Sequence, residues 1–279
     1  MENNGAFTSK RTGVTTKYFK KGTSKNALLL IHGLGCSSLE WSENIDYLSE
    51  NISVIAVDLI GFGASDKPNR FVYSANAQAL QLIELMQELG FNEFHLAGNS
   101  YGGKVAIEIV DLIKERAKSL TLVASAGGGK EAPFPLRLQT LPIIGEFLPS
   151  PNFEQFKLGW ELAFYDKKYL TEERVKKKFE DSNKANAKKS HLKTLRQMIN
   201  IFGFKRSDYT NLSSKYGRIT CPVLIVWGAN DLFLPLEHAH NFNKKIKNSK
   251  LVIFNECGHA PQIERSKEFN DLLTKFIVI

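Results

Sequence analysis

Short apolar runs alternate with longer segments of helical periodicity along most of the chain. Six runs are apolar on both faces, as in strands of a parallel sheet that helices cover on both sides; they span residues 26–32, 52–58, 94–98, 120–124, 223–227 and 251–254. Helical periodicity recurs between and after these runs, at 75–89, 102–113, 237–246 and 267–276. The alternation predicts an α/β fold with a mostly parallel central sheet flanked by helices.

The alternation stops after Ala126. A glycine run at 127–129 opens a proline-containing stretch, and three helical patterns follow it, at 152–165, 171–181 and 185–202. Strand character returns only at Ile219. We therefore expect a core domain made of residues 1–126 and 219–279, with a helical insertion at 127–218.

The composition is that of an ordinary globular protein. The 279 residues are 43% hydrophobic and 24% charged, enough for one large domain carrying an insertion. No stretch reaches the roughly 20 apolar residues that span a bilayer, and the N-terminus has no apolar signal segment. Cys36, Cys221 and Cys257 match no zinc or disulfide pattern, so we expect a cytoplasmic protein with reduced thiols.

The net charge of +8 is concentrated in the insertion. Between residues 167 and 196, eleven Lys or Arg stand against four Asp or Glu. Such a run is usually a solvated helix face, and its charge favours at most a weak attraction to anionic surfaces. No nucleic-acid-binding module accompanies the charge, so nucleic acid is not expected as a partner.

The strongest chemical signal is the segment Gly98-Asn99-Ser100-Tyr101-Gly102. It is a G-x-S-x-G pattern placed directly between a predicted strand and a predicted helix. In that context the chain makes a sharp turn that exposes a serine hydroxyl above the sheet, and the glycines avoid clashes in the turn. We therefore predict Ser100 as a nucleophile.

A serine nucleophile needs a base, and the base needs a carboxylate to orient it. His259 follows the last predicted strand and is the predicted base; Asp231 follows the strand before and is the predicted carboxylate. Asp58 also ends a strand but precedes Ser100, so we expect a structural role for it. The remaining histidines fit less well, because they lie in strands, helices or the basic insertion: His32, His95, His191, His238 and His240.

A fourth element follows the first long apolar run, as His32-Gly33-Leu34-Gly35. A tetrahedral intermediate needs backbone N–H groups aimed at its oxyanion. We expect one donor from Tyr101, which follows the nucleophile, and one from Leu34 in this loop.

These motifs together resemble the α/β-hydrolase superfamily of serine hydrolases with a helical cap. The segments HGLG, DLIGFGASDKP, GNSYGG, WGANDLFLP and GHAPQIE extend over nearly the whole chain, in the order Ser, Asp, His. The resemblance implies that the insertion is a cap and that substrate lies between cap and sheet.

The main predicted function is hydrolysis of carboxylic esters with small to medium apolar acyl groups. Ser100 would form an acyl-enzyme, and water activated by His259 would release the acid. A few apolar side chains of the insertion would line the acyl pocket. This mechanism needs no metal and no organic cofactor.

Three alternatives remain open. A carbon–carbon bond hydrolase of the meta-cleavage product type is similar in GNSxGG, but that family usually has Trp where this chain has Ala260, and Gly-Pro-Gly where it has Gly35-Cys36-Ser37. A receptor-like, non-catalytic hydrolase fold would not need the intact triad. A dinucleotide-binding protein would use Gly33 and Gly35, but Ser38 stands at the third glycine position.

Overall fold

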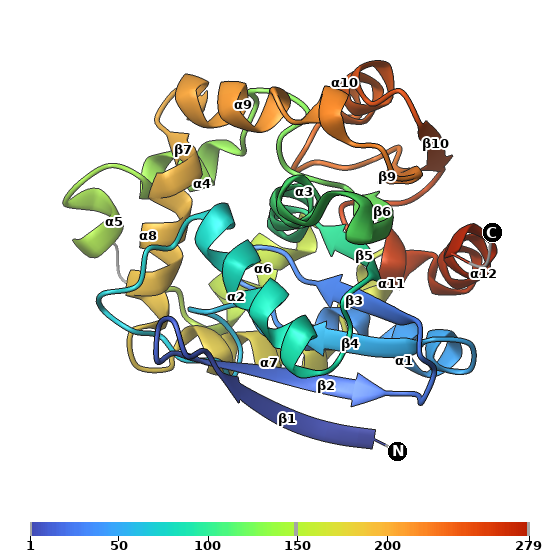
Figure 1. Cartoon of the computed structure of the whole chain (residues 1–279). Coiled ribbons are helices and arrows are strands. Elements are labelled where there is room, and N and C mark those ends of the chain that lie inside the picture. The colour runs from blue at the N-terminus through green and yellow to red at the C-terminus, as the bar shows by residue number, and fades with distance from the viewer. Residues whose placement is uncertain (1, 148–149, 278–279) are drawn as a thin grey trace.

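The computed structural model describes residues 2–147 and 150–277, and within them one large sheet forms the centre of the molecule (Figure 1). Its order is β1-β2-β4-β3-β5-β6-β9-β10. The strands are β1 (Glu2–Thr8), β2 (Thr15–Lys21), β3 (Ala27–Ile31), β4 (Ser53–Val57), β5 (Phe94–Asn99), β6 (Ala117–Val123), β9 (Val223–Gly228) and β10 (Ser249–Phe254). From β4 to β10 all neighbours are parallel, so the predicted α/β fold is confirmed.

The N-terminal hairpin of β1 and β2 was not predicted from the sequence. β2 joins the sheet antiparallel to β4, with Tyr18 opposite Val57. β1 is the edge strand of the sheet, and β2 lies between β1 and β4 with only one of its seven residues buried. They therefore lack the apolar run that identified the central strands.

Helices cover both faces of the sheet. The principal ones are α2 (Ala75–Glu88), α3 (Tyr101–Ile113) and α10 (Glu237–Lys245) on one face, and α1 (Ser42–Ser49) and α12 (Ser266–Ile277) on the other. Successive residues of β3 alternate between two apolar layers, Leu29 and Ile31 in one, Leu28 and Leu30 in the other. This two-sided burial explains why the central strands are continuously apolar. None of the helices among the described residues is long and apolar enough to cross a membrane.

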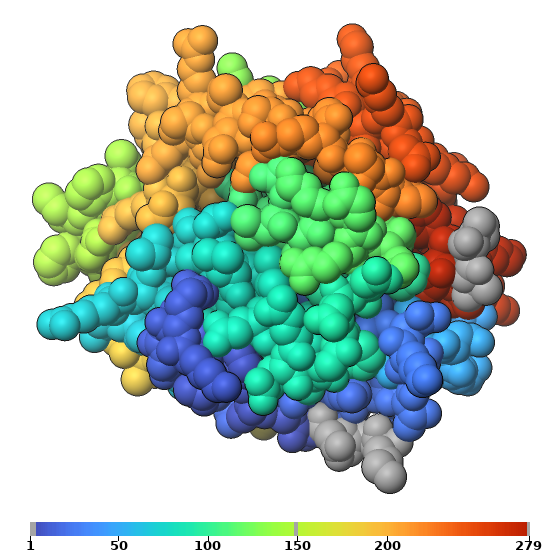
Figure 2. Space-filling view, viewed as in Figure 1, coloured from blue at the N-terminus to red at the C-terminus, as the bar shows by residue number. Residues whose placement is uncertain are grey.

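The segment between β6 and β9 is largely helical and lies to one side of the sheet (Figures 1 and 2). It contains α4 (Phe134–Gln139), α5 (Ile144–Phe147), α6 (Phe153–Glu161), α7 (Glu172–Ser182), α8 (Ala187–Met198), α9 (Arg206–Ser213), β7 (Ile199–Asn200) and β8 (Gly203–Phe204). The helix expected at 185–202 ends at Met198, because the following residues pair as β7 and β8. The domain boundaries at 127 and 218 remain a prediction.

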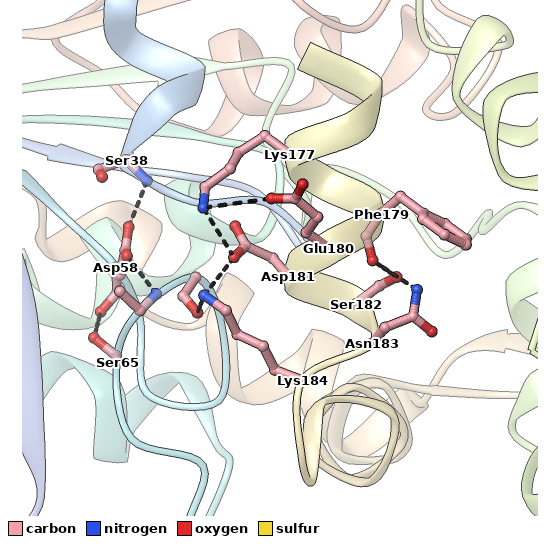
Figure 3. A network of polar contacts seen from close by, with 12 residues as sticks. Ser38, Asp58, Ser65, Lys177, Phe179, Glu180, Asp181, Ser182, Asn183 and Lys184 are labelled. Atoms are coloured by element: carbon pink, nitrogen blue, oxygen red, sulfur yellow. Dashed lines mark hydrogen bonds and ion pairs between the residues drawn. The ribbon is translucent and has the colours of Figure 1, made fainter. Parts of the chain in front are cut away.

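Four 3₁₀ turns complete the described elements: η1 (Ser38–Trp41), η2 (Lys114–Arg116), η3 (Lys167–Tyr169) and η4 (Tyr216–Arg218). The first of them is fixed by Asp58, whose carboxylate accepts the N–H of Ser38 at 2.7 Å and that of Ala64 at 2.7 Å (Figure 3). Near this loop, Lys184 pairs with Asp181 at 2.6 Å and donates to the Gly63 carbonyl at 3.1 Å. The turn after α7 is thus tied to the loop after β4, and Asp58 has a structural role, as predicted.

Candidate active site

Ser100 occupies a strained turn between β5 and α3. Its backbone has φ 53° and ψ −117°, a conformation that non-glycine residues rarely adopt. The turn is held by hydrogen bonds, since the Ser100 N–H donates to Val123 O at 2.9 Å and its carbonyl accepts the Ala126 N–H at 3.0 Å. The half-buried serine is therefore presented at the carboxyl ends of the parallel strands.

The flanking glycines are required by close packing. A Cβ on Gly98 would lie 2.4 Å from the carbonyl carbon of Gly102, and a Cβ on Gly102 would lie 2.2 Å from Ile31 O. On the other side of the turn, a Cβ on Gly33 would lie 3.2 Å from the Ser100 Cβ. The loop after β3 therefore lies directly against the predicted nucleophile.

Asp231 and His259 are brought together as predicted. The Nδ1–H of His259 donates to Asp231 Oδ2 at 2.7 Å, and their side chains are 12% and 0% exposed. The other oxygen of Asp231 accepts the N–H groups of Phe233 at 2.8 Å and Leu234 at 2.9 Å. Both carboxylate oxygens are thus engaged, which fixes the carboxylate and leaves Nε2 of His259 as the proton acceptor.

The loop of His259 is joined to the serine turn through Asn99. Its side-chain amide donates to His259 O and to Val123 O, both at 3.2 Å. Within the described residues no hydrogen bond links the Ser100 Oγ to His259, and such bonds are often longer before substrate binds. Asn99 was part of the predicted motif, but no role for its side chain could be read from the sequence.

The loop after β3 is shaped by a neutral histidine. His32 Nδ1–H donates to Gly33 O at 2.7 Å, while its Nε2 accepts the Leu59 N–H at 2.9 Å. Burial lowers the pKa of His32, although Asp58 opposes the shift. Across the described residues, the N–H groups of Leu34 and Tyr101 have no hydrogen-bond acceptor, so both remain free for an oxyanion.

A buried carboxylate connects the His259 loop with the inserted segment. Glu264, in α11 (Pro261–Glu264), accepts N–H groups from Gly258 at 2.7 Å, Tyr165 at 2.8 Å and Asp166 at 3.2 Å. The N–H of His259 itself donates to Ala163 O at 2.7 Å. Burial raises the pKa of Glu264, and the three N–H donors counteract this. The sequence contained Glu264 in GHAPQIE but gave no sign of this bridging role.

Aromatic and apolar side chains surround the catalytic edge. The Phe233 ring stacks on His259 with 5.2 Å between centroids, and a Cβ on Gly35 would lie 3.6 Å from the Trp160 ring. A groove of about 450 Å³ lies beside Asp231 and combines residues from both parts of the chain. Its lining is Leu158, Glu161, Leu162, Phe164, Tyr165, Lys167, Asn230 and Leu232.

Four of the other five histidines bond elsewhere. Besides His32, His95 meets Ser119 Oγ at 2.8 Å, and His191 meets Gln139 Oε1 at 3.2 Å. His238 pairs with Glu131 at 2.9 Å. Of the histidine contacts described, only that of His259 reaches Asp231.

Comparison with known proteins agrees with this arrangement. A family model described as the alpha/beta hydrolase fold matches residues 26–266. A 2-hydroxy-6-oxononadienedioate/2-hydroxy-6-oxononatrienedioate hydrolase of Burkholderia vietnamiensis is 27% identical over 270 residues, 95% of this chain and 92% of that protein.

Solved structures show the same similarity. A 2-hydroxy-6-oxo-6-phenylhexa-2,4-dienoate hydrolase from a Rhodococcus species superimposes with a TM-score of 0.83 at 26% identity, covering 100% of this chain and 99% of that one. A membrane phospholipase A superimposes with a TM-score of 0.79 at 27% identity, covering 99% and 86%. The fold alone therefore does not select the bond that is cleaved.

These relatives correct the main functional prediction. Ester hydrolysis as the leading reaction, with its preference for small to medium apolar acyl groups, is wrong; the similar curated hydrolases act on 2-hydroxy-6-oxo compounds, which favours the carbon–carbon alternative. The physical reason is that a serine nucleophile, assisted by the same base and oxyanion loop, can attack the carbonyl carbon of an ester or of a ketone. Ala260 and Gly35-Cys36-Ser37 had counted against that alternative, but the similarity over 95% of the chain outweighs these two local differences.

Proposed function

The chain belongs to the α/β-hydrolase fold family, and from this premise we propose that it hydrolyses a carbon–carbon bond next to a ketone, as meta-cleavage product hydrolases do. The buried Asp231–His259 hydrogen bond beside the strained Ser100 turn supports a serine hydrolase mechanism, and the choice of bond is carried by the comparisons. Similarity over nearly the full length to hydrolases of 2-hydroxy-6-oxo compounds supports the type of substrate.

In this proposal Ser100, His259 and Asp231 act as a triad. His259 Nε2 accepts the Ser100 hydroxyl proton as Oγ attacks the ketone carbon, and Asp231 stabilises the imidazolium. The ketone oxygen becomes an alkoxide, which the N–H groups of Leu34 and Tyr101 stabilise. Both N–H groups lack another acceptor, which supports this assignment.

The leaving group is a carbanion, so the electron pair of the broken carbon–carbon bond must be stabilised by conjugation. A 2-hydroxy-6-oxo-2,4-diene must therefore first move its 2-hydroxyl proton to C5, which gives a C2 ketone conjugated with a C3=C4 double bond. The pair of the broken C5–C6 bond then delocalises through that double bond onto the C2 oxygen, and the resulting dienolate takes the proton from His259. Water, activated by His259, then hydrolyses the acyl-serine. Overall, a ketone and water give a carboxylic acid and a compound with a new C–H bond.

We further propose that residues 127–218 act as a cap over this edge. The hydrogen bonds from His259 and Glu264 to 163–166 support it, because they join the segment directly to the base.

The test is product analysis with two benzoyl compounds. One is 2-hydroxy-6-oxo-6-phenylhexa-2,4-dienoate, and the other is its analogue with a methyl group in place of the carboxylate. The proposal expects benzoate from at least one of them, with one oxygen taken from ¹⁸O-labelled water. Ser100→Ala should release none. Folded wild-type protein that leaves both ketones intact would refute the proposal.

A further inference from the structure

A buried ion pair lies at the boundary between α7 and the core. Lys178 Nζ is 2.6 Å from Glu40 Oε1, and the two side chains are 5% and 6% exposed. Lys178 also donates to Cys36 Sγ at 3.3 Å and lies 3.8 Å from the centroid of the Trp160 ring. Neither Lys178 nor Glu40 has a part in the proposed hydrolysis.

The pair borders the loop that carries the predicted oxyanion donor. Cys36 belongs to that loop, since its N–H donates to Gly33 O at 3.3 Å and its thiol to Leu34 O at 3.7 Å. Trp160 covers the same loop at Gly35. Lys178 therefore contacts two residues at the oxyanion loop. Cys36 belongs to the loop, and Trp160 belongs to the inserted segment and packs against Gly35.

The charges of the pair balance. Burial opposes ionisation of Glu40, but attraction to Lys178 outweighs it and holds the pKa of the carboxyl below its usual value. Burial likewise disfavours the ammonium, and the ion pair with Glu40 opposes this, so that the pKa of Lys178 is raised. Burial raises the pKa of Cys36 to about 12, so the thiol is neutral and adds no charge.

The other polar group beside this loop is also neutral at pH 7. The Nδ1 of His191 would lie 3.9 Å from a Cβ on Gly35, and burial lowers the pKa of this histidine to about 4. In the contacts of the described residues, Lys178 is the cation that borders the loop, and Glu40 has already neutralised it.

A carboxylate arriving at Lys178 would have to share it with Glu40. The buried group would then hold two anions and one cation, and desolvating the additional charge without a full partner is costly. The substrates named for the similar hydrolases are carboxylates, a dienoate and dioates. Among the described residues, the cation next to the oxyanion loop is Lys178, and it is already paired with Glu40.

We propose that Glu40 is an internal counter-ion that excludes carboxylates from the Lys178 side of the site, so that the substrate is an uncharged conjugated ketone at that end. The inference rests on the proposed carbon–carbon hydrolysis and specifies its substrate class. Glu40 and Lys178 are then specificity-determining residues and not catalytic ones.

The experiment compares kcat/KM for the phenyl dienoate and its methyl analogue in four proteins: wild type, E40Q, E43Q and the double variant E40Q/K178M. Wild type should favour the methyl analogue. E40Q frees Lys178 for a carboxylate and should raise the dienoate-to-methyl ratio about tenfold or more, as a charged hydrogen bond allows. E43Q is the matched control, because Glu43 also pairs with α7, through Arg174 at 3.1 Å, but is 49% exposed. Its ratio should stay that of wild type.

The double variant shows whether the raised dienoate-to-methyl ratio of E40Q needs the Lys178 cation. E40Q/K178M should have the wild-type ratio and should still cleave the methyl analogue. A wild type that prefers the dienoate would overturn the inference, as would a folded E40Q whose ratio equals that of E43Q. Should E40Q fail to fold, the wild-type ratio decides alone.

If no variant cleaves either ketone, the proposed function fails, and calorimetric binding of both compounds to Ser100→Ala judges the inference. Tighter binding of the dienoate would overturn it, and tighter binding of the methyl analogue would support it.

Discussion

The carboxyl edge of the sheet and the segment inserted after β6 are built differently. At the edge, Ser100 and Asp231 follow the buried strands β5 and β9, and His259 follows the edge strand β10. Hydrogen bonds with backbone groups hold all three in place. The inserted segment consists of short helices with several exposed apolar side chains, among them Phe147 at 79% and Leu158 at 61%. It is joined to the core both by polar contacts and by apolar packing, for example of Leu195 and Leu212. In our proposal the edge therefore carries the bond-breaking chemistry, while the inserted segment contributes to selectivity.

The largest expected effect on the chemistry of the carboxyl edge comes from removing the predicted nucleophile. Ser100→Ala should lower kcat for ketone hydrolysis by about 10⁶-fold, because triad members act as one unit. The melting temperature should change little, since the hydroxyl has no structural hydrogen bond among the described residues. Single-turnover assays with circular dichroism melts would measure both. Residual turnover within tenfold of wild type would place the chemistry elsewhere.

The second prediction concerns Asp231→Asn. Because one oxygen of Asp231 accepts two N–H groups, the new amide NH₂ should face His259 and force the wrong tautomer. We expect kcat to fall about 10⁴-fold with geometry retained. Steady-state kinetics measure kcat for this variant. Asn230→Ala is the control, because Asn230 is exposed and directly precedes Asp231. Equal losses in both variants would argue against a specific role of Asp231.

The carboxyl edge and the inserted segment also differ in how much of them could be predicted from the sequence. The positions of Ser100, Asp231 and His259 at strand ends could be expected, because each lies next to an apolar run or a glycine in the sequence; their catalytic roles stay a prediction. Glu264 and the Glu40–Lys178 pair could not, because their partners lie roughly 100 and 138 positions away in the chain and meet only after folding. The β1–β2 hairpin was missed because β1 is an edge strand and β2 is only partly buried, so neither needs a continuous apolar run.

A third prediction addresses the connection between edge and inserted segment. Glu264→Gln keeps the size of the side chain but places an NH₂ group among three N–H donors. We expect kcat to fall about ten- to a hundredfold through misplacement of His259, with KM changing less. Stability should fall by about 1–3 kcal/mol from the unsatisfied groups. Glu268→Gln, 60% exposed on α12, is the control. A changed stability with unchanged kcat would leave Glu264 a purely structural role.

The smallest expected effect is a pH dependence of stability from His191. Its pKa in the folded protein is about 4, below the usual 6.5, because burial disfavours the charged ring. The unfolded chain therefore binds more protons between these values, so stability is full above pH 6.5 and is lost as pH falls towards 4. Urea unfolding across this range should show a shallower decline for His191→Gln than for wild type. Exposed His240→Gln should follow wild type; identical slopes in all three proteins would contradict the assignment.

The most direct test of carbon–carbon hydrolysis is a competition between two benzoyl substrates in one sample. The conjugated benzoyl ketone that the enzyme cleaves best is mixed with a benzoate ester of similar size, and both kcat/KM values are followed by chromatography. An ester is the easier bond to break, so a general esterase would consume it first. We predict that kcat/KM for the ketone equals or exceeds that for the ester, and that both are lost in Ser100→Ala. Rapid ester turnover with the ketone intact would contradict the account.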